Sequence, residues 1–477
     1  MTQVRVLQIR CFTVPMKTRF PFRYGIASLT ELPHLLMQVQ LEVDGVVEYG
    51  ISADGLPPKW FTKNPQTQFD DDDLPQMQLS IRRAARSALE ITSGESWFDW
   101  WMQLYAATRG MAASTGMAPL MAGFGFSLVE RAVLHAFCRL RRASIHDVFC
   151  HNMLQLDGAA LRPELAGVPL GQCLSPAPRP FIAVRHTIGL GDPLTGHDAA
   201  STQRPNDGLP FTLEENIREY GLSYFKIKLS GDFDQDHHRL RAISEIIRRE
   251  AVVRPRVTVD GNENYAEISE FRDHWQAHRA DSAIQEFLDH SLLFVEQPLH
   301  RDRALGDDVR AALQDWAQAP PVIIDESDAE LSSLPRALEL GYAGTSHKNC
   351  KGVIKGLLNA ATLAAVRRHG GAGILSAEDL ANVGPVALLQ DLAVVACLGM
   401  THVERNGHHY FAGLSMFGRS QQEQVLKDHP DLFGRHKTGF AAVRIRDGRL
   451  ALGSVNAAPF GVAELPDRDS LTEWEIG

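Results

Sequence analysis

The chain has 477 residues, of which 44% are hydrophobic and 22% charged, and its formal net charge at pH 7 is −10. This length predicts two or three domains, and a pI near 6.0 argues against nucleic acid as a partner, since that usually requires a basic face. The six cysteines include no CxxC pair, which fits a reducing compartment. The first residues lack the apolar core of a signal sequence, and no run approaches the ~18 apolar residues of a membrane span. We therefore expect a cytoplasmic protein with no membrane partner.

The first 50 residues alternate between apolar and polar side chains, as antiparallel strands do. The alternation is clearest in residues 35–43, after which Asp44-Gly45 supplies a hairpin turn. Residues 16–33, MKTRFPFRYGIASLTELP, are predicted to form a long loop, either a functional lid or a disordered segment. Apolar residues at helical spacing in residues 117–140 predict helices packed on this sheet. Residues 1–178 are therefore predicted to form an α+β domain.

From Phe181 the pattern changes to short apolar strands that alternate with amphipathic helices. The strand-like segments are FIAVRHTIG, YFKIK, RVTVD, LLFVE, PVIID, AGTSHK, GILSAE and MTHVERNG. This alternation favours a parallel sheet, and eight such strands favour an α/β fold of the (β/α)8 TIM-barrel type over an open doubly wound sheet. We assign the barrel to residues 179–435. Residues 436–477 return to hairpin-like alternation and are predicted to rejoin the N-terminal domain as part of a cap.

Three successive strands of this predicted barrel end on a carboxylate, at Asp260, Glu296 and Asp325. In such a barrel the C-terminal strand ends form the active site, so these side chains should meet on one rim. Neighbouring carboxylates repel unless they are protonated or bind a cation, and hard oxygen ligands favour Mg²⁺ or Mn²⁺ over zinc. Helix caps or loop salt bridges are the alternative, but they do not explain three carboxylates on consecutive strands. The three residues are predicted metal ligands.

Lysines lie on either side of these carboxylates. Lys226 and Lys228 are two apart on one strand, so both side chains point to the same face. Crowding and burial lower the pKa of a lysine, which suits a general base. Lys348, four strands further round, should face them across the carboxylates, unless it is a surface lysine that precedes a helix. Two such bases could remove a proton from one face of a substrate and return it to the other, while a cation stabilises the enediolate.

The motifs K-x-K, D-x-N, E-Q-P, D-E-S and K-x-x-K-G occur in this order on successive strands, beginning at residues 226, 260, 296, 325 and 348. In this order and strand context the chain resembles the enolase superfamily, and most closely its muconate lactonizing enzyme-like subgroup in the mandelate racemase/muconate lactonizing enzyme family. The resemblance covers nearly the whole chain and implies a cap domain, a barrel and a C-terminal return to the cap. It implies a base at Lys228 supported by Lys226, a second base at Lys348, and Mg²⁺ ligands at Asp260, Glu296 and Asp325. Further motif positions, expected next to these ligands, are Asn262, Glu326 and Lys351.

The resemblance implies a Mg²⁺-dependent enzyme, with Mn²⁺ as a second possible ion, that abstracts the proton α to the carboxylate of a small substrate. The outcome would be epimerisation, racemisation or cycloisomerisation, in a homo-oligomer. Two alternatives stay open: β-elimination by a lyase or dehydratase on an acid sugar or hydroxy acid, and a catalytically silent barrel with a binding role. Candidate substrate-binding residues, from the cap loop, the first strand and the late strand ends, are Arg23, Tyr24, His186, His347 and Glu378.

The sequence also departs from the family pattern around the expected pocket. After the cap hairpin it reads YGISADG, without the glutamate of the usual GxGE-like end, and His347 stands where an apolar residue is usual. The departures leave the substrate open. Three histidines at the last strand end, His402, His408 and His409, are predicted to lie in a surface loop and not to bind metal.

Overall fold

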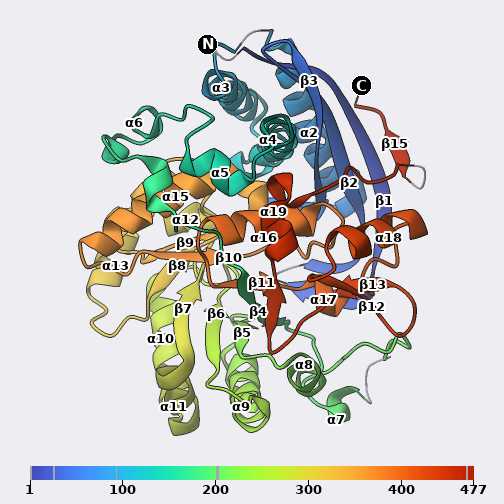
Figure 1. Cartoon of the computed structure of the whole chain (residues 1–477). Coiled ribbons are helices and arrows are strands. Elements are labelled where there is room, and N and C mark those ends of the chain that lie inside the picture. The colour runs from blue at the N-terminus through green and yellow to red at the C-terminus, as the bar shows by residue number, and fades with distance from the viewer. Residues whose placement is uncertain (1–2, 25–26, 93, 200–203, 469–470, 477) are drawn as a thin grey trace.

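The computed structural model describes residues 3–24, 27–92, 94–199, 204–468 and 471–476. A cap of antiparallel strands and helices covers one end of a barrel of parallel strands (Figure 1). Both termini lie on the cap, at the top of the view in Figure 1.

The barrel contains all eight predicted strands in chain order, and it closes because the last strand pairs with the first. Its strands are β4 (Phe181–Ile188), β5 (Tyr224–Lys228), β6 (Arg256–Asp260), β7 (Leu292–Glu296), β8 (Val322–Ile324), β9 (Gly344–His347), β10 (Ile374–Ala377) and β11 (His402–Arg405). Every pairing in the ring is parallel. The predicted (β/α)8 barrel is therefore confirmed.

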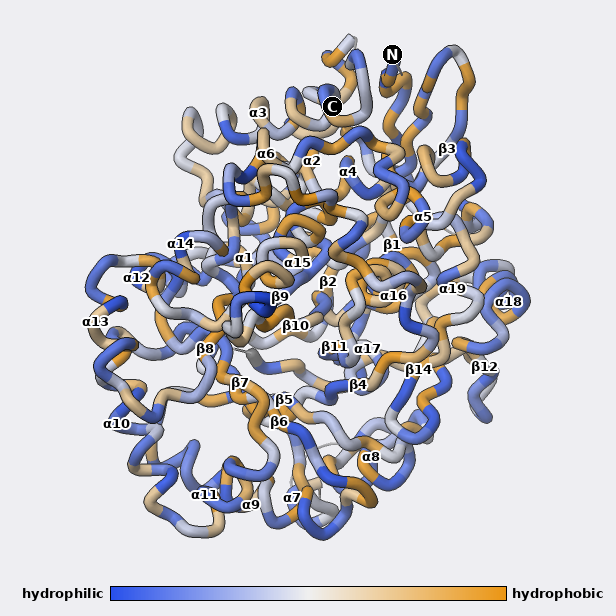
Figure 2. The backbone as a smooth tube through the Cα atoms, turned by 60° about the vertical axis from the view of Figure 1, so that its left-hand side comes forward, coloured by the Kyte–Doolittle hydropathy of each residue, from blue (hydrophilic) through white to orange (hydrophobic). Residues whose placement is uncertain are grey.

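Helices alternate with these strands, as the sequence predicted. The longer ones are α8 (Leu213–Tyr220), α9 (Phe233–Glu250), α10 (Ile268–Arg279), α11 (Ser282–Ser291), α14 (Ser333–Leu340), α15 (Val353–Arg368) and α16 (Ala387–Cys397). In α9 the side chains of Leu240, Ile243 and Ile247 are buried, whereas its arginines at 241, 248 and 249 are exposed. In Figure 2 the outer helices α10 and α11 likewise mix hydrophilic and hydrophobic colours.

The cap is built on a four-stranded antiparallel sheet. Its strands, in the order β15-β1-β2-β3, are β15 (Thr472–Trp474), β1 (Val4–Tyr24), β2 (Ala27–Val43) and β3 (Val46–Gly55). Asp44 and Gly45 have φ of 51° and 79°, the left-handed pair that a two-residue hairpin turn requires, so the predicted turn is confirmed. Helices α2 (Leu74–Glu90), α3 (Trp97–Thr115) and α4 (Pro119–Arg141) pack on the sheet. Helix α4 is apolar enough to span a membrane, but 94% of its most apolar window is buried within the protein.

The loop predicted at residues 16–33 is instead the far end of the β1–β2 hairpin. Pairing continues to Phe22 opposite Leu29 and Arg23 opposite Ser28. From Met16 to Arg23 buried residues alternate with less buried ones, so this stretch has the period of a strand. Its prolines concealed that period, because proline usually interrupts strands. The prediction of a loop was wrong.

The C-terminal segment is divided between the two parts of the molecule. Strand β13 (Ala441–Val443) pairs with β12 (Phe433–Arg435) in a separate two-stranded sheet. Strand β14 (Arg449–Ala451) adds to the barrel strand β4, and β15 pairs with β1 of the cap. We had expected the whole segment to rejoin the cap, but in the described residues only β15 joins the cap sheet.

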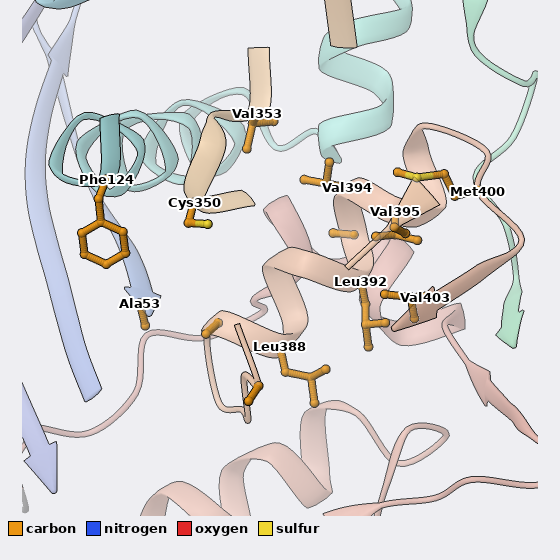
Figure 3. Packing of buried hydrophobic residues seen from close by; sticks show 14 of the residues in the cluster. Ala53, Phe124, Cys350, Val353, Leu388, Leu392, Val394, Val395, Met400 and Val403 are labelled. Carbon is orange, nitrogen blue, oxygen red and sulfur yellow. The ribbon is translucent and has the colours of Figure 1, made fainter. Parts of the chain in front are cut away.

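Cap and barrel share one apolar core. Figure 3 shows Leu392 and Val395 of α16 packed beside Val403 of β11, while Phe124 of the cap helix α4 lies in the same cluster on the other side of the view, beyond Cys350. A buried carboxylate of the same cap helix fixes the two parts more specifically: Glu130 accepts a hydrogen bond from the backbone N–H of Val353, at the first residue of α15 (2.6 Å). The cap is thus anchored directly beside the end of the sixth barrel strand.

Candidate active site

The ends of β5, β6 and β7 bring the predicted groups side by side. Strand register places Lys228 opposite Asp260 and Asp260 opposite Glu296, and Asp325 follows β8 directly. The carboxylates of all three predicted ligands are buried, each residue being at most 2% exposed. The expected meeting of these side chains on one rim is what the structure shows.

Lys226 lies in the middle of a ring of carboxylates. Its Nζ is 2.8–3.0 Å from carboxylate oxygens of four residues, which are Asp260, Glu296, Glu378 and Glu404. Two of these belong to the predicted ligands, and the other two come from the ends of the seventh and eighth strands. A buried ammonium is stabilised only where such partners surround it.

The other two lysines lie on either side of this ring. Lys228 Nζ donates to Asp260 Oδ2 (2.6 Å), and Lys348 Nζ donates to Asp325 Oδ2 (2.7 Å) and Glu378 Oε2 (2.5 Å). Both lysines line the same cavity. The arrangement offers one amino group on each side of whatever that cavity holds.

The pKa of Lys226 is raised and not lowered as expected. Burial lowers the pKa of Lys226, but the charges of the surrounding carboxylates outweigh it and raise that pKa well above its ordinary value. The pKa of Lys348 is raised in the same way, mainly by Asp325 and Glu378 against the effect of burial. The prediction assumed that neighbouring ammonium groups would repel one another. In the structure Lys226 and Lys348 have more carboxylates than ammonium groups around them, so their charged forms are favoured.

Three carboxylates converge closely enough to hold one metal ion. Glu296, Asp325 and Glu378 each offer an oxygen, and these oxygens lie within 4.8 Å of one another. Glu296 Oε1 accepts no hydrogen bond from the residues that the structure describes, and burial together with the charge of Glu378 raises the pKa of Glu296 well above its ordinary value. A buried carboxylate oxygen that no donor satisfies can be satisfied by a cation, and an all-oxygen set fits Mg²⁺ or Mn²⁺.

This set overlaps with the predicted ligands without matching them. Glu378, which we had assigned to substrate, takes the place of Asp260. The Oδ2 atom of Asp260 is instead held by Lys226 (2.9 Å) and Lys228 (2.6 Å). Two alternative third ligands are therefore available beside Glu296 and Asp325.

The residues expected next to the ligands hold the carboxylates in place. Lys351 Nζ donates to Asp325 Oδ1 (2.9 Å) and to its backbone oxygen (3.0 Å). The backbone N–H of Asn262 donates to Asp260 Oδ1 (2.8 Å). Burial, with the charge of Asp325, raises the pKa of Glu326 to about 8. All three thus lie against the carboxylate cluster.

The cavity over the lysines has a volume of about 50 Å³ and lies between barrel and cap. Its floor includes Lys226, Lys228 and Lys348, and its roof consists of cap residues, which are Phe22, Leu29, Pro57 and Trp60. Trp60 is the nearest of these to the chemistry, since Lys348 Nζ lies 4.9 Å from the centre of its ring. Such a cation–π contact favours the charged form of the lysine. No sequence motif distinguished Trp60.

Charged contacts hold this roof on the barrel. Arg301, at the start of α12 (Arg301–Ala304), donates to the backbone oxygens of Trp60 (2.9 Å) and Phe61 (2.7 Å) in the cap helix α1 (Pro58–Thr62). The same guanidinium binds Glu263 in a bidentate pair (2.8 and 2.7 Å). Fork-shaped contacts of this kind fix direction as well as distance, so the position of Trp60 depends on the barrel loops.

Three of the predicted substrate-binding residues do not line this cavity. Arg23 is exposed and packs near Gly191. The His347 ring lies under α15 against Gly356, with Nε2 3.0 Å from Asn349 Oδ1, and burial lowers its pKa to about 3. His186 is buried below the pocket, and the side chain of Tyr24 lies outside the described residues. Of the five residues, Glu378 alone is described at the cavity.

Two of the three histidines predicted for a surface loop are buried. His408 and His409 lie in the short helix α17 (Gly407–Tyr410) and are 7% and 2% exposed. His186 Nδ1 lies 3.1 Å from His408 Nε2, and its ring centre is 4.9 Å from that of His409. Burial lowers the pKa of His186 to about 3 and lowers those of His408 and His409 well below their ordinary value. The prediction of surface positions was wrong for these two histidines, whereas His402 is half-buried at the start of β11. The rings of His186, His408 and His409 form a neutral group.

A buried arginine that sequence reasoning overlooked connects His402 of β11 with the carboxylates. Arg185 of β4 donates to Glu378 Oε1 (3.0 Å) and lies 2.7 Å from His402 Nδ1. Its side chain is fully buried. Along each barrel strand every second side chain points inside the barrel, but this alternation alone does not show which inward side chain has a function.

Comparison with known proteins places this geometry in a family. The model of the family described as "Enolase C-terminal domain-like" matches residues 212–450, half of the chain. A search of curated proteins returned no match. Among solved structures, a mandelate racemase/muconate lactonizing protein from Herpetosiphon aurantiacus is 18% identical, with a TM-score of 0.60 over 96% of this chain and 98% of that one.

Two further solved structures resemble the chain over nearly its whole length. A dipeptide epimerase from Enterococcus faecalis, complexed with Mg and the dipeptide L-Leu-L-Tyr, is 15% identical, with a TM-score of 0.59 over 96% of this chain and 99% of that one. A muconate lactonizing enzyme from Pseudomonas fluorescens, complexed with muconolactone, is 16% identical, with a TM-score of 0.58 over 98% of each chain. At these identities the likeness establishes the fold.

Proposed function

The chain belongs to the enolase superfamily, in its mandelate racemase/muconate lactonizing enzyme-like group. From that premise we propose that it catalyses a Mg²⁺-dependent isomerisation, in which it abstracts the proton α to the carboxylate of a small substrate. Mn²⁺ is the alternative ion, and the isomerisation is an epimerisation, racemisation or cycloisomerisation. The observation that carries the proposal is the placement of Lys228 and Lys348, which line one cavity from opposite sides of a carboxylate cluster. The names of the similar structures, which include an epimerase and lactonizing enzymes, support the same class of outcome.

The carboxylate cluster would hold the ion. Glu296 and Asp325 belong to both ligand sets, and either Asp260 or Glu378 completes the site. When bound, the ion supplies positive charge beside the substrate carboxylate, where negative charge develops on deprotonation. Lys228 contacts Asp260 and Lys348 contacts Asp325, so both amino groups lie beside the carboxylate cluster and would face the α-carbon of a substrate whose carboxylate binds there.

The two lysines divide the proton transfer between them. One amino group takes the α-proton as the C–H bond breaks and its electrons move into the carboxylate to form an enediolate; the opposite ammonium then returns a proton to the other face. Lys228 takes the role of base, and Lys348, whose Nζ donates to Asp325 and Glu378, takes the role of donor. Lys226 remains between the carboxylates and limits their repulsion. The apolar roof excludes water, which strengthens each of these interactions.

Exchange of the α-proton with solvent deuterium tests this step. A panel of dipeptides, N-acyl amino acids and acid sugars is incubated with the protein in D₂O, and exchange is followed by NMR. We expect Lys228→Met and Lys348→Met each to reduce exchange about 10²- to 10⁴-fold, one for each configuration of the substrate. Lys427→Met, at an exposed lysine of α18 (Arg419–Asp428), is the matched control and should have no effect. Exchange that survives both active-site changes, or that survives exhaustive chelation, would contradict the proposal.

A further inference from the structure

A second and larger cavity lies away from the lysines, on the side of the barrel. It has a volume of about 710 Å³ and is walled by residues 204–220 on one side and residues 434–446 on the other. Cavities of 300–1,000 Å³ are the ordinary size of small-molecule sites. None of the residues that line it also lines the cavity over the lysines. The proposed proton abstraction makes no use of it.

The walls of this cleft carry unpaired positive charge. Three of its basic residues already have acidic partners, in the pairs Arg204–Glu215, Arg218–Glu250 and Arg435–Glu423. Lys437, Arg444 and Arg446 have no carboxylate within ion-pair distance among the described residues, and only Glu219 among the acidic lining residues lacks a basic partner. The cleft therefore has an excess of positive charge, although the whole chain has a net charge of −10. A cleft lined by one sign of charge concentrates ligands of the opposite sign.

Two glycines leave room for these basic side chains. A Cβ at Gly434 would lie 2.2 Å from Arg444 Nε, and a Cβ at Gly208 would lie 2.9 Å from Lys437 Cε. Arg444 also donates from Nη1 to the backbone oxygen of Pro430 (3.0 Å). The guanidinium therefore lies close to the backbone of β12 at Gly434 with one donor occupied, and its remaining donors are available to an acceptor in the cleft.

The opposite wall is fixed to the cap. Arg19 of β1, whose side chain is 3% exposed, binds Asp207 (2.5 Å) and donates to the backbone oxygen of Pro210 (3.1 Å). A wall held in this way does not have to be ordered by a ligand, which lowers the free-energy cost of binding. Buried apolar groups at Leu209 and Ile445 complete the cleft.

We propose that this cleft binds a small molecule with a cluster of anionic oxygens, either a phosphate ester or a polycarboxylate, and that Arg444, Arg446 and Lys437 hold those oxygens. Guanidinium groups bind both kinds of anion through paired hydrogen bonds. More than one negative charge is needed to match three unpaired cations. The apolar part of the ligand packs on Leu209, Tyr220 and Ile445.

Isothermal titration of the full-length, metal-free protein with pyrophosphate and with citrate tests the site. We expect saturable binding of one molecule per chain, and the tighter of the two probes identifies the anion class. The double change Arg444→Ser with Arg446→Ser should weaken binding at least about 10-fold, in line with the loss of charge-assisted hydrogen bonds. Arg83→Ser, at an exposed arginine of α2 without an ion-pair partner among the described residues, is the matched control and should leave binding unchanged.

Two further variants separate this site from the others. Gly434→Ala keeps every charge but displaces Arg444, so it should weaken binding as well, while its melting temperature shows whether it folds. Lys348→Met removes a cation of the lysine cavity and should not change binding of the probe. Absence of saturable binding at 0.15 M salt, equal losses in Arg83→Ser, or a loss confined to Lys348→Met would each overturn the proposal; none of these results bears on proton exchange.

Discussion

Buried polar groups are stabilised differently on the two sides of the barrel mouth, by ion pairs on one side and by uncharged contacts on the other. Around β5 to β9, lysines and carboxylates alternate at 2.5–3.0 Å, and each ion depends on its neighbours. Around β4 and α17, three buried histidines lie against one another without charge. A buried ion needs a counter-ion, whereas an imidazole can lose its proton. One side can therefore bind a cation and move protons, while the other is a neutral wall.

Arg185 lies between Glu378 of the charged side and His402 of β11, and its removal should have the largest effect. Arg185→Met keeps most of the side-chain volume but removes the ion pair with Glu378 and the contact with His402. Loss of one partner of a buried pair costs about 3–5 kcal/mol, and we expect a value near the lower end because Glu378 keeps its two lysines. Urea unfolding measures the change, with the surface variant Arg83→Ser, expected within about 0.5 kcal/mol of the parent, as control. A cost below about 1 kcal/mol would show that the buried ions of the charged side do not depend on this ion pair.

The charged side could be predicted from sequence because each of its main groups ends a strand. A run of apolar residues followed by Asp260, Glu296 or Asp325 is local information, and barrel topology then brings such ends together. Lys228 and Lys348 are identified in the same way. Glu378 was found too, as a candidate for substrate binding, and it lines the cavity. That its oxygen also lies close to those of Glu296 and Asp325 could not be predicted, because the distances between side chains depend on the tertiary structure.

The neutral side and the roof could not be predicted in this way. His408 and His409 follow the last strand in a polar stretch, and only their packing under β1 and beside α8 buries them. Phe22 and Trp60 reach the cavity from the cap, which contacts the barrel through residues far away in sequence. The strand period of residues 16–23 was present in the sequence, but prolines made a loop the simpler interpretation. Long-range contacts, and not local propensity, decide these positions.

Metal binding by single variants can show which carboxylates coordinate the ion. Glu378 and Glu404 both contact Lys226 (3.0 and 2.8 Å) and both are buried, but only Glu378 has an oxygen close to those of Glu296 and Asp325. We expect Glu378→Gln to weaken Mn²⁺ binding at least about 10-fold, measured by electron paramagnetic resonance of the free ion. Glu404→Gln removes the same charge next to the same lysine and should have an effect of less than about 3-fold, since it leaves the ligand set intact.

Asp260→Asn completes this comparison. A large loss of Mn²⁺ affinity in Asp260→Asn, with none in Glu378→Gln, would return the site to the ligand set implied by the resemblance. Equal losses in Glu378→Gln and Glu404→Gln would mean that net charge, and not coordination, sets the affinity. If the unmodified protein binds no Mn²⁺ or Mg²⁺ at all, the metal-dependent function itself is contradicted.

The smallest effect expected is on the neutral side, at His186. Burial lowers the pKa of His186 to about 3, whereas an unfolded histidine titrates near 6.5. Between these values the unfolded chain binds a proton that the folded chain does not, so stability is complete above about pH 6.5 and falls as the pH decreases. For one such histidine the loss between pH 7.5 and pH 5.5 is about 1.4 kcal/mol. His186→Phe should therefore lose less stability than the parent over this interval, by about that amount, in urea unfolding at the two pH values. An identical pH dependence in the two proteins would mean that His186 is protonated in the folded chain, and the electrostatic contrast between the two sides of the barrel mouth would then be wrong.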